Sequence, residues 1–220
     1  MNFLFSSFDA DGFKNWLIPL GGMMIMMPTS YWLISNTMSK IFSLITETVF
    51  SDLNALMGEK NQGGEFMFMG LFLCIIMMNG LGLFPYIFTS SSHLCISLGL
   101  GLPLWLGSQM MCWFYFTNES FSHLVPEGSP SMLVPLLVLI ELVSNMIRPM
   151  TLSIRLMANM VAGHLLLTLL GGGANLNSPM LIIGVMLGLM VMLLLELGVG
   201  IIQGYVFMLL SSLYVLEVMH

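Results

Sequence analysis

The sequence predicts an all-α membrane protein with about five membrane segments plus an amphipathic surface helix. Of its 220 residues, 57% are hydrophobic and only 7% are charged, and the mean hydropathy is +0.95. A soluble domain carries about 25% charged residues, so this chain has too little polar surface for water to be its solvent. We therefore expect residues 1–220 to form a single integral membrane domain.

Charge and cysteine content exclude several other classes of protein. Five Lys and Arg residues and a formal net charge of −6 argue against binding to a nucleic-acid backbone. Cys74, Cys95 and Cys112 lie in apolar runs without C-x-x-C spacing, which predicts buried thiols rather than a metal site or a disulfide framework. The first residues are neither basic nor Arg-rich, so we expect no secretory or transit signal.

Three apolar runs predict ordinary membrane-spanning helices, at residues 16–35, 66–88 and 94–116. Each is close to the ~20 residues that a helix needs to cross a bilayer. Pro19 and Pro28 in the first run predict kinks, which membrane helices tolerate. The third run ends in the aromatic residues WFYF, which are typical of a membrane interface.

Between the first two spans, residues 37–57 predict an amphipathic helix that lies along the membrane surface. Apolar side chains recur at helical spacing from Met38 to Leu56, and polar residues such as Glu47 and Asn54 occupy the other faces. The alternative is an ordinary loop helix that packs on a partner.

The last two apolar runs, 131–170 and 178–216, are too long for single upright spans. A continuous helix of about 40 residues is about 60 Å long, whereas the hydrocarbon core is about 30 Å thick. Each run therefore forms two spans, bends out into water, or tilts steeply. Because no strong turn sequence interrupts either run, we expect a hairpin of two long, tilted or bent helices, joined at GGGANLNSP.

A permanent charge lies in the middle of the first long run, at Arg155. An arginine at the centre of a membrane helix costs roughly 2.5–3.5 kcal/mol on insertion scales. Glu141, Arg148 and Arg155 are seven residues apart and share one helical face, with Asn159 one turn further on. On an ideal helix, His164 lies roughly opposite Arg155. These residues predict an ion pathway rather than a lipid-facing surface.

The second long run carries Glu196 and Gln203, which are seven residues apart with Gly200 between them. A carboxyl group at this depth must be neutral, paired across helices, or hydrated. His164 on the preceding helix is a candidate partner, and a His–Glu pair can exchange protons near neutral pH. The small neighbours Gly163 and Gly200 favour close helix approach or water entry.

Each of these residues also has a purely structural interpretation. Glu141 can reach an interface, Asn159 and Gln203 can bond between helices, and His164 can be a structural histidine. Arg155 can belong to a buried structural ion pair. The hypothesis of an ion pathway rests on their combination.

The segment from Ser153 to Leu166, SIRLMANMVAGHLL, is preceded by VPLLVLIELVSNMIRP and followed later by LELGVGIIQGYVFMLLSSLY. Together these motifs closely resemble subunit a of F-type ATP synthases, in its mitochondrial form. The motifs lie in the C-terminal part of the chain, and the order of the remaining spans fits the family more weakly. The resemblance implies a non-catalytic, proton-translocating stator subunit, multi-pass in the mitochondrial inner membrane.

The resemblance also implies roles for the polar residues. Arg155 would face a rotating ring of c subunits, attract its carboxylates and block direct proton flow between two offset half-channels. Glu196 and His164 would line the half-channel from the intermembrane space, and Glu141 the half-channel to the matrix. The remaining two residues would give polar support to the arginine or the ring carboxyl: Asn159 and Gln203. Arg148 stands where some relatives carry a neutral residue, and it receives no role.

The partners implied are the c-ring, other membrane-sector and peripheral-stalk subunits, the lipid bilayer and protons, with no cofactor, metal or nucleic acid. One alternative function is a stand-alone proton-coupled secondary transporter with a site at Arg155 and Glu196. Such transporters usually contain internal repeats, and we find none in this sequence. A haem-binding subunit would need paired histidines, but the histidines here are scattered.

Overall fold

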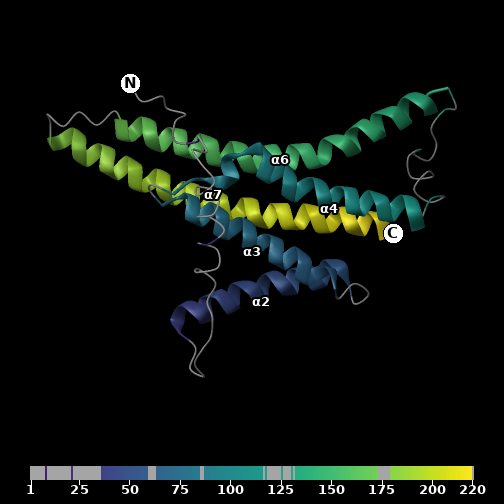
Figure 1. Ribbon diagram of the computed structural model, residues 1–220, viewed down its shortest axis with the longest axis horizontal. Helices are drawn as coiled ribbons and strands as arrows, with labels where there is room; N and C mark the ends of the chain where they lie inside the picture. Colours follow the sequence, from purple (N-terminus) through teal and green to yellow (C-terminus); the bar gives the residue numbers. More distant parts are fainter. Residues whose placement is uncertain are drawn as a thin grey trace.

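The computed structural model describes residues 36–58, 63–84, 87–115, 132–172 and 179–219, together with Phe8, Gly21, Thr117, Val125 and Pro130. Its main elements are all helical, which confirms the predicted all-α fold (Figure 1). Within these residues, four helices are long and apolar enough to cross a membrane. The predicted span at 16–35 lies outside the described residues, except for Gly21.

Helix α2 (Thr37–Met57) forms where the amphipathic pattern predicted a helix, and its C-terminal half packs on the rest of the chain. Leu53 and Met57 lie one turn apart on the same face, and both are buried in a cluster that includes Met208. The helix ends at Gly58, whose φ of 66° lies in the left-handed region that favours glycine. In the N-terminal half, apolar side chains such as Ile41 remain exposed.

A buried carboxylate links α2 to helix α3 (Gly64–Gly82). Glu65 lies in the first turn of α3, where the helix dipole favours a negative charge. With its amide nitrogen turned toward α3, Asn54 of α2 donates hydrogen bonds to both oxygens of Glu65. This pairing satisfies a charge that would otherwise be costly to bury.

Glycines allow α3 and helix α7 (Pro179–Met219) to approach closely. A Cβ atom at Gly204 would lie 3.1 Å from Ile76 Cγ1, and one at Gly200 would lie 3.4 Å from Asn79 Cβ. Residue numbers rise along α7 as they fall along α3, so the two helices are antiparallel. This alignment brings the C-terminal end of α3 level with the turns of α7 just before Gly200.

Helix α4 (Leu94–Tyr115) packs antiparallel against helix α6 (Val134–Gly172), as Figure 1 shows. The two helices approach closely at Gly101, where a Cβ atom would lie 2.7 Å from Ser153 Oγ. Ser153 Oγ is buried and donates a hydrogen bond of 2.9 Å to the Pro149 carbonyl oxygen within α6. Glycine therefore permits the contact between these helices.

Helices α6 and α7 run side by side as a long pair, here called the α6–α7 hairpin (Figure 1). They are single helices of 39 and 41 residues, which excludes the alternative of two spans in each run. At ~1.5 Å per residue each is about 60 Å long, about twice the hydrocarbon thickness. Their tilt in the membrane stays a prediction. Helix α6 is bent in Figure 1, and Pro149 inside it is a residue that typically causes kinks.

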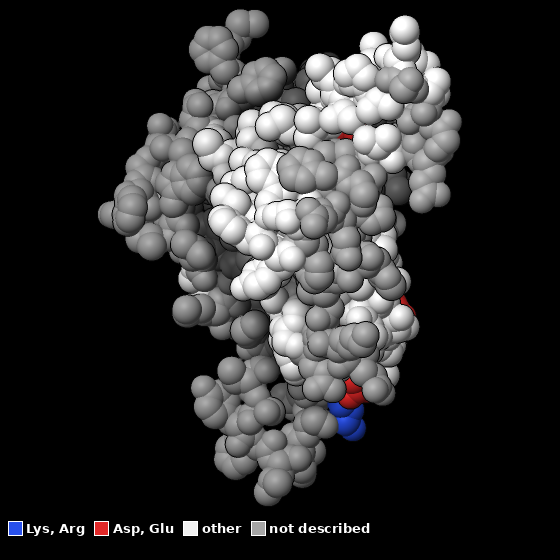
Figure 2. Space-filling view, turned by 90° about the vertical axis from the view of Figure 1, so that its right-hand side faces the viewer, with Lys and Arg blue, Asp and Glu red and all other residues white. Residues whose placement is uncertain are grey.

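The surface of the molecule is largely apolar. In Figure 2 the described residues are almost all uncharged, and most of the visible charge lies low in the view, at the height of α2. Large apolar side chains are exposed along both helices of the hairpin, among them Leu139, Ile147, Leu187 and Leu194. Such a surface suits lipid or another apolar protein surface.

Candidate functional site

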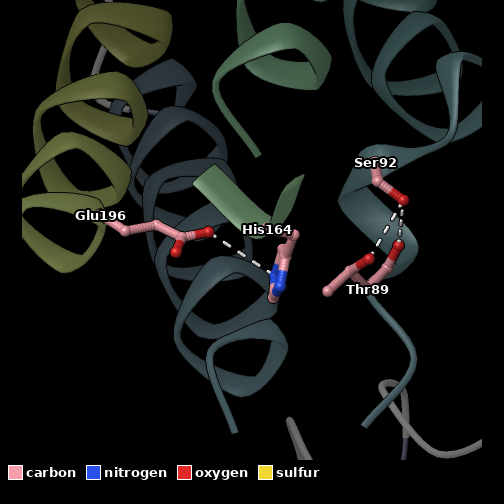
Figure 3. Close-up of polar contacts among 4 residues, drawn as sticks. All are labelled: Thr89, Ser92, His164 and Glu196. Carbon is pink, nitrogen blue, oxygen red and sulfur yellow. Dashed lines mark hydrogen bonds and ion pairs between the residues drawn. The ribbon is translucent and has the colours of Figure 1, made fainter. Parts of the chain in front are cut away.

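A buried acid–imidazole pair joins the two helices of the hairpin. Glu196 of α7 is 8% exposed, and its Oε1 lies 3.6 Å from Nε2 of His164 on α6 (Figure 3). This distance is within ion-pair range but longer than a hydrogen bond. The structure thus brings together the two residues that the sequence suggested as partners.

Gly163 makes room for this pair. A Cβ atom at Gly163 would lie 2.6 Å from both Cδ and Oε1 of Glu196. Those separations are far below van der Waals contact, so the carboxyl group occupies the space beside the glycine. Gly163, which was predicted to allow close helix approach near His164, therefore allows the Glu196 carboxyl group to lie where it does.

An aromatic ring from the N-terminal part of the chain borders the imidazole. The Phe8 ring meets the His164 ring edge-on, with centroids 6.3 Å apart and an interplanar angle of 83°. Sequence reasoning missed Phe8, which is one of four phenylalanines in the first 13 residues and precedes the first predicted span. Its position restricts the space around one side of the histidine.

A second polar contact between the helices lies further along the hairpin. Asn159 Nδ2 donates a hydrogen bond of 3.4 Å to Gln203 Oε1, and Gln203 is buried. Between Glu196 and Gln203 on α7, the Gly200 carbonyl oxygen accepts a hydrogen bond of 3.4 Å from Asn79 Nδ2 of α3. One face of α7 therefore points its polar groups into the protein.

Arg155 lies on α6 between the two ends of the hairpin, but its side chain is exposed. Within the described part of the chain, no hydrogen bond or ion pair involves its guanidinium group. The structural alternative of a buried intrachain ion pair for Arg155 is therefore not seen among these residues. Asn159 and Gln203 bond to each other rather than to the arginine.

A third polar group lies toward the N-terminal end of α6. Arg148 Nη2 is 3.9 Å from Glu141 Oε1, and both side chains are partly exposed. The Arg148 guanidinium also lies over the ring of Tyr214 on α7, 5.7 Å from its centroid. The shared face of Glu141 and Arg148 was predicted from their spacing, whereas the contact with Tyr214 was not.

Buried polar residues outside the hairpin were also missed by sequence reasoning. Asn79 and the hydroxyl residues Thr89 to Ser92 are all buried. The signal was available as an asparagine inside an apolar span and as three consecutive serines after it. No periodic pattern in the sequence indicates that these residues lie beside α6 and α7.

The arrangement is suited to moving protons rather than to covalent catalysis. Histidine and carboxyl groups exchange protons, amides and hydroxyls donate and accept hydrogen bonds, and a guanidinium group stays charged. Among the described residues, no cluster of His, Cys, Asp and Glu could hold a metal ion.

Comparison with known proteins identifies the family. The family model described as ATP synthase A chain matches residues 15–216. ATP synthase subunit a of Anopheles gambiae is 46% identical, with 99% of both chains covered. The subunits a of Aedes aegypti and Drosophila melanogaster are 45% and 44% identical over the same share of each chain. This chain therefore belongs to the ATP synthase subunit a family.

Proposed function

We propose that this chain passes protons through two offset half-channels to and from carboxylates on a ring of c subunits, with Arg155 between the half-channels. Membership of the family makes the chain the non-catalytic, proton-conducting stator subunit of the membrane sector, in the mitochondrial inner membrane. It assembles with other ATP synthase subunits. The full-length match leaves no support for a stand-alone transporter.

The observation that carries the proposal is the contrast between Arg155 and Glu196. Glu196 is buried beside His164, whereas Arg155 is exposed on the same hairpin without an ion-pair partner in the described residues. A charge amid apolar surface is costly unless another charge meets it. A carboxylate on an adjoining ring supplies that countercharge.

In this proposal a proton from the intermembrane space reaches the Glu196–His164 pair and passes to a ring carboxylate. The neutral carboxyl can then turn into the lipid, because it no longer carries a charge that is costly there. At the end of the turn it releases its proton toward Glu141 and the matrix. Asn159 and Gln203 keep the path between these positions polar.

Arginine suits the position between the half-channels because it does not give up its proton at the pH of a cell. Its positive charge repels a proton that would pass directly from one half-channel to the other. It also pairs briefly with each ionised carboxylate of the ring. A proton crossing 100 mV releases about 2.3 kcal/mol, so a direct leak would waste the gradient.

The test is ATP-driven proton pumping by inner-membrane vesicles that carry Arg155→Ala, with assembly of the complex measured in parallel. We expect assembly to persist and pumping to be lost. The matched control is Ser212→Ala, because Ser212 is buried and its hydroxyl bonds only within its own helix. Pumping that survives Arg155→Ala in an assembled complex would overturn the proposal.

A further inference from the structure

A buried turn of hydroxyl residues lies between α3 and α4. Thr89 and the 3-10 helix η3 (Ser90–Ser92) form this turn, here called the hydroxyl turn, and all of its residues are buried. Thr89 Oγ1 donates to Ser92 Oγ at 3.1 Å, and Ser92 Oγ donates to the Thr89 carbonyl oxygen at 2.6 Å. Four hydroxyls buried in so apolar a chain call for a physical reason.

The packing of the helices places the hydroxyl turn level with the Glu196–His164 pair. Because α4 is antiparallel to α6 and Gly101 meets Ser153, the residues just before α4 lie beside the part of α6 near His164. A Cβ atom at Gly82 would touch both Thr89 Cγ2 and Met160 Cε, and Met160 is one turn before His164. Figure 3 shows Thr89 and Ser92 on the other side of His164 from Glu196.

Several buried polar atoms in this region have no hydrogen-bond partner among the described residues. They are Ser91 Oγ, Asn79 Oδ1, His164 Nε2 and both carboxyl oxygens of Glu196. Ser91 is only 2% exposed, so its hydroxyl is not simply hydrated at the protein surface. Buried polar groups in proteins are nearly always satisfied, and where protein atoms do not bond to them, internal water does.

We propose that the hydroxyl turn, through Ser91, anchors water that carries protons between the intermembrane-space surface and the Glu196–His164 pair. This inference rests on the proposed function. Each water takes up one proton and gives up another, so the serine and threonine hydroxyls end unchanged. Hydroxyl groups suit this position because each both donates and accepts a hydrogen bond and carries no charge that would trap the proton.

The test is whether a cysteine at position 91 is reached through water. Silver ions are small, bind thiolates and travel in water rather than hydrocarbon. Cys74, Cys95 and Cys112 are first replaced by alanine, and Ser91→Cys is then introduced into the assembled complex. We expect silver to abolish proton pumping by Ser91→Cys at a concentration that leaves the cysteine-free complex active.

Ser212→Cys is the matched control, because Ser212 is equally buried and its hydroxyl donates to the Leu209 carbonyl oxygen at 2.8 Å. We expect pumping by this variant to be unaffected by silver. Silver should also act faster on mitoplasts, which expose the intermembrane-space face, than on inverted vesicles. Should Ser91→Cys fail to assemble, Thr89→Cys takes its place in the same comparison.

Glu196→Gln, measured in the same membranes, separates the two proposals. Loss of pumping by Glu196→Gln together with silver-resistant Ser91→Cys would overturn only the role of the hydroxyl turn. Faster silver inhibition from the matrix side would also overturn it, since the turn would then belong to the other half-channel. Full pumping by Glu196→Gln would overturn the proposed function itself.

Discussion

The carboxyl group of Glu196 occupies the space that a side chain on Gly163 would fill. A Cβ atom there would lie 2.6 Å from Glu196 Cδ. The position of the Glu196 carboxyl group on α7 therefore depends on the absence of a side chain at Gly163 on α6. Nε2 of His164, the next residue on α6, lies 3.6 Å from Oε1 of the same carboxyl group.

The first prediction concerns this contact. Gly163→Ala should displace the Glu196 carboxyl from His164 and lower proton pumping by between about tenfold and a hundredfold, because small misplacements of reacting groups have effects of that size. Pumping per assembled complex is the measurement. Gly188→Ala on α7 is the control, since a Cβ atom there meets nothing within 4 Å. Equal pumping by both variants would contradict the prediction.

The second prediction concerns the pairing of Glu196 with His164. Glu196→His and His164→Glu should each lower proton pumping by about tenfold or more, because each leaves two like groups where, under the proposed function, an acid and an imidazole exchange protons. The double exchange restores one of each and should recover part of the loss. A double variant whose loss is the product of the two single losses would show that the two residues act independently.

The third prediction tests whether Arg155 acts through its positive charge alone or also through the shape and permanent protonation of its guanidinium group. Arg155→Lys keeps a positive charge but loses the planar fork that pairs with a carboxylate, and lysine can deprotonate in an apolar site. We expect pumping to fall by about tenfold or more. Passive proton flow through the membrane sector, with the catalytic sector removed, should not fall in parallel. Normal coupled pumping by Arg155→Lys would reduce the role of the residue to its charge.

The fourth prediction concerns the contact between α4 and α6. Gly101→Ala should destabilise the subunit by about 1–3 kcal/mol, the usual cost of overpacking, because its methyl group would meet Ser153 Oγ. Thermal inactivation of the assembled complex measures the effect. The double variant Gly101→Ala with Ser153→Ala removes the clashing oxygen and should recover much of the stability. No recovery would place the strain elsewhere in the contact.

Much of the fold follows from residue patterns that do not depend on tertiary context. Two long apolar runs predicted the two long helices because no strong turn sequence lies within either of them. The seven-residue spacing of Glu141 and Arg148 predicted that they share one face of the helix. In the structure, Arg148 Nη2 lies 3.9 Å from Glu141 Oε1. Helical periodicity sets the face of its own helix on which a side chain lies, whatever packs around that helix.

Contacts between segments far apart in sequence were harder to predict. Asn159 and Gln203 were expected to support the arginine or the ring carboxyl, or to bond between helices, but their positions in the sequence did not show that they bond to each other. The approach of Phe8 to His164 and of Tyr214 to Arg148 depends on how whole helices pack. Periodicity gives the direction of a side chain on its own helix, but it does not say which element lies opposite.

The continuity of α6 has one further consequence. Arg155 does not divide the stretch from Glu141 to His164 evenly: at ~1.5 Å per residue, it lies about 21 Å from the former and about 14 Å from the latter along the axis. The two sides of the arginine are therefore not mirror images. Under the proposed function, the guanidinium therefore lies closer along α6 to His164 of the intermembrane-space half-channel than to Glu141 of the matrix half-channel.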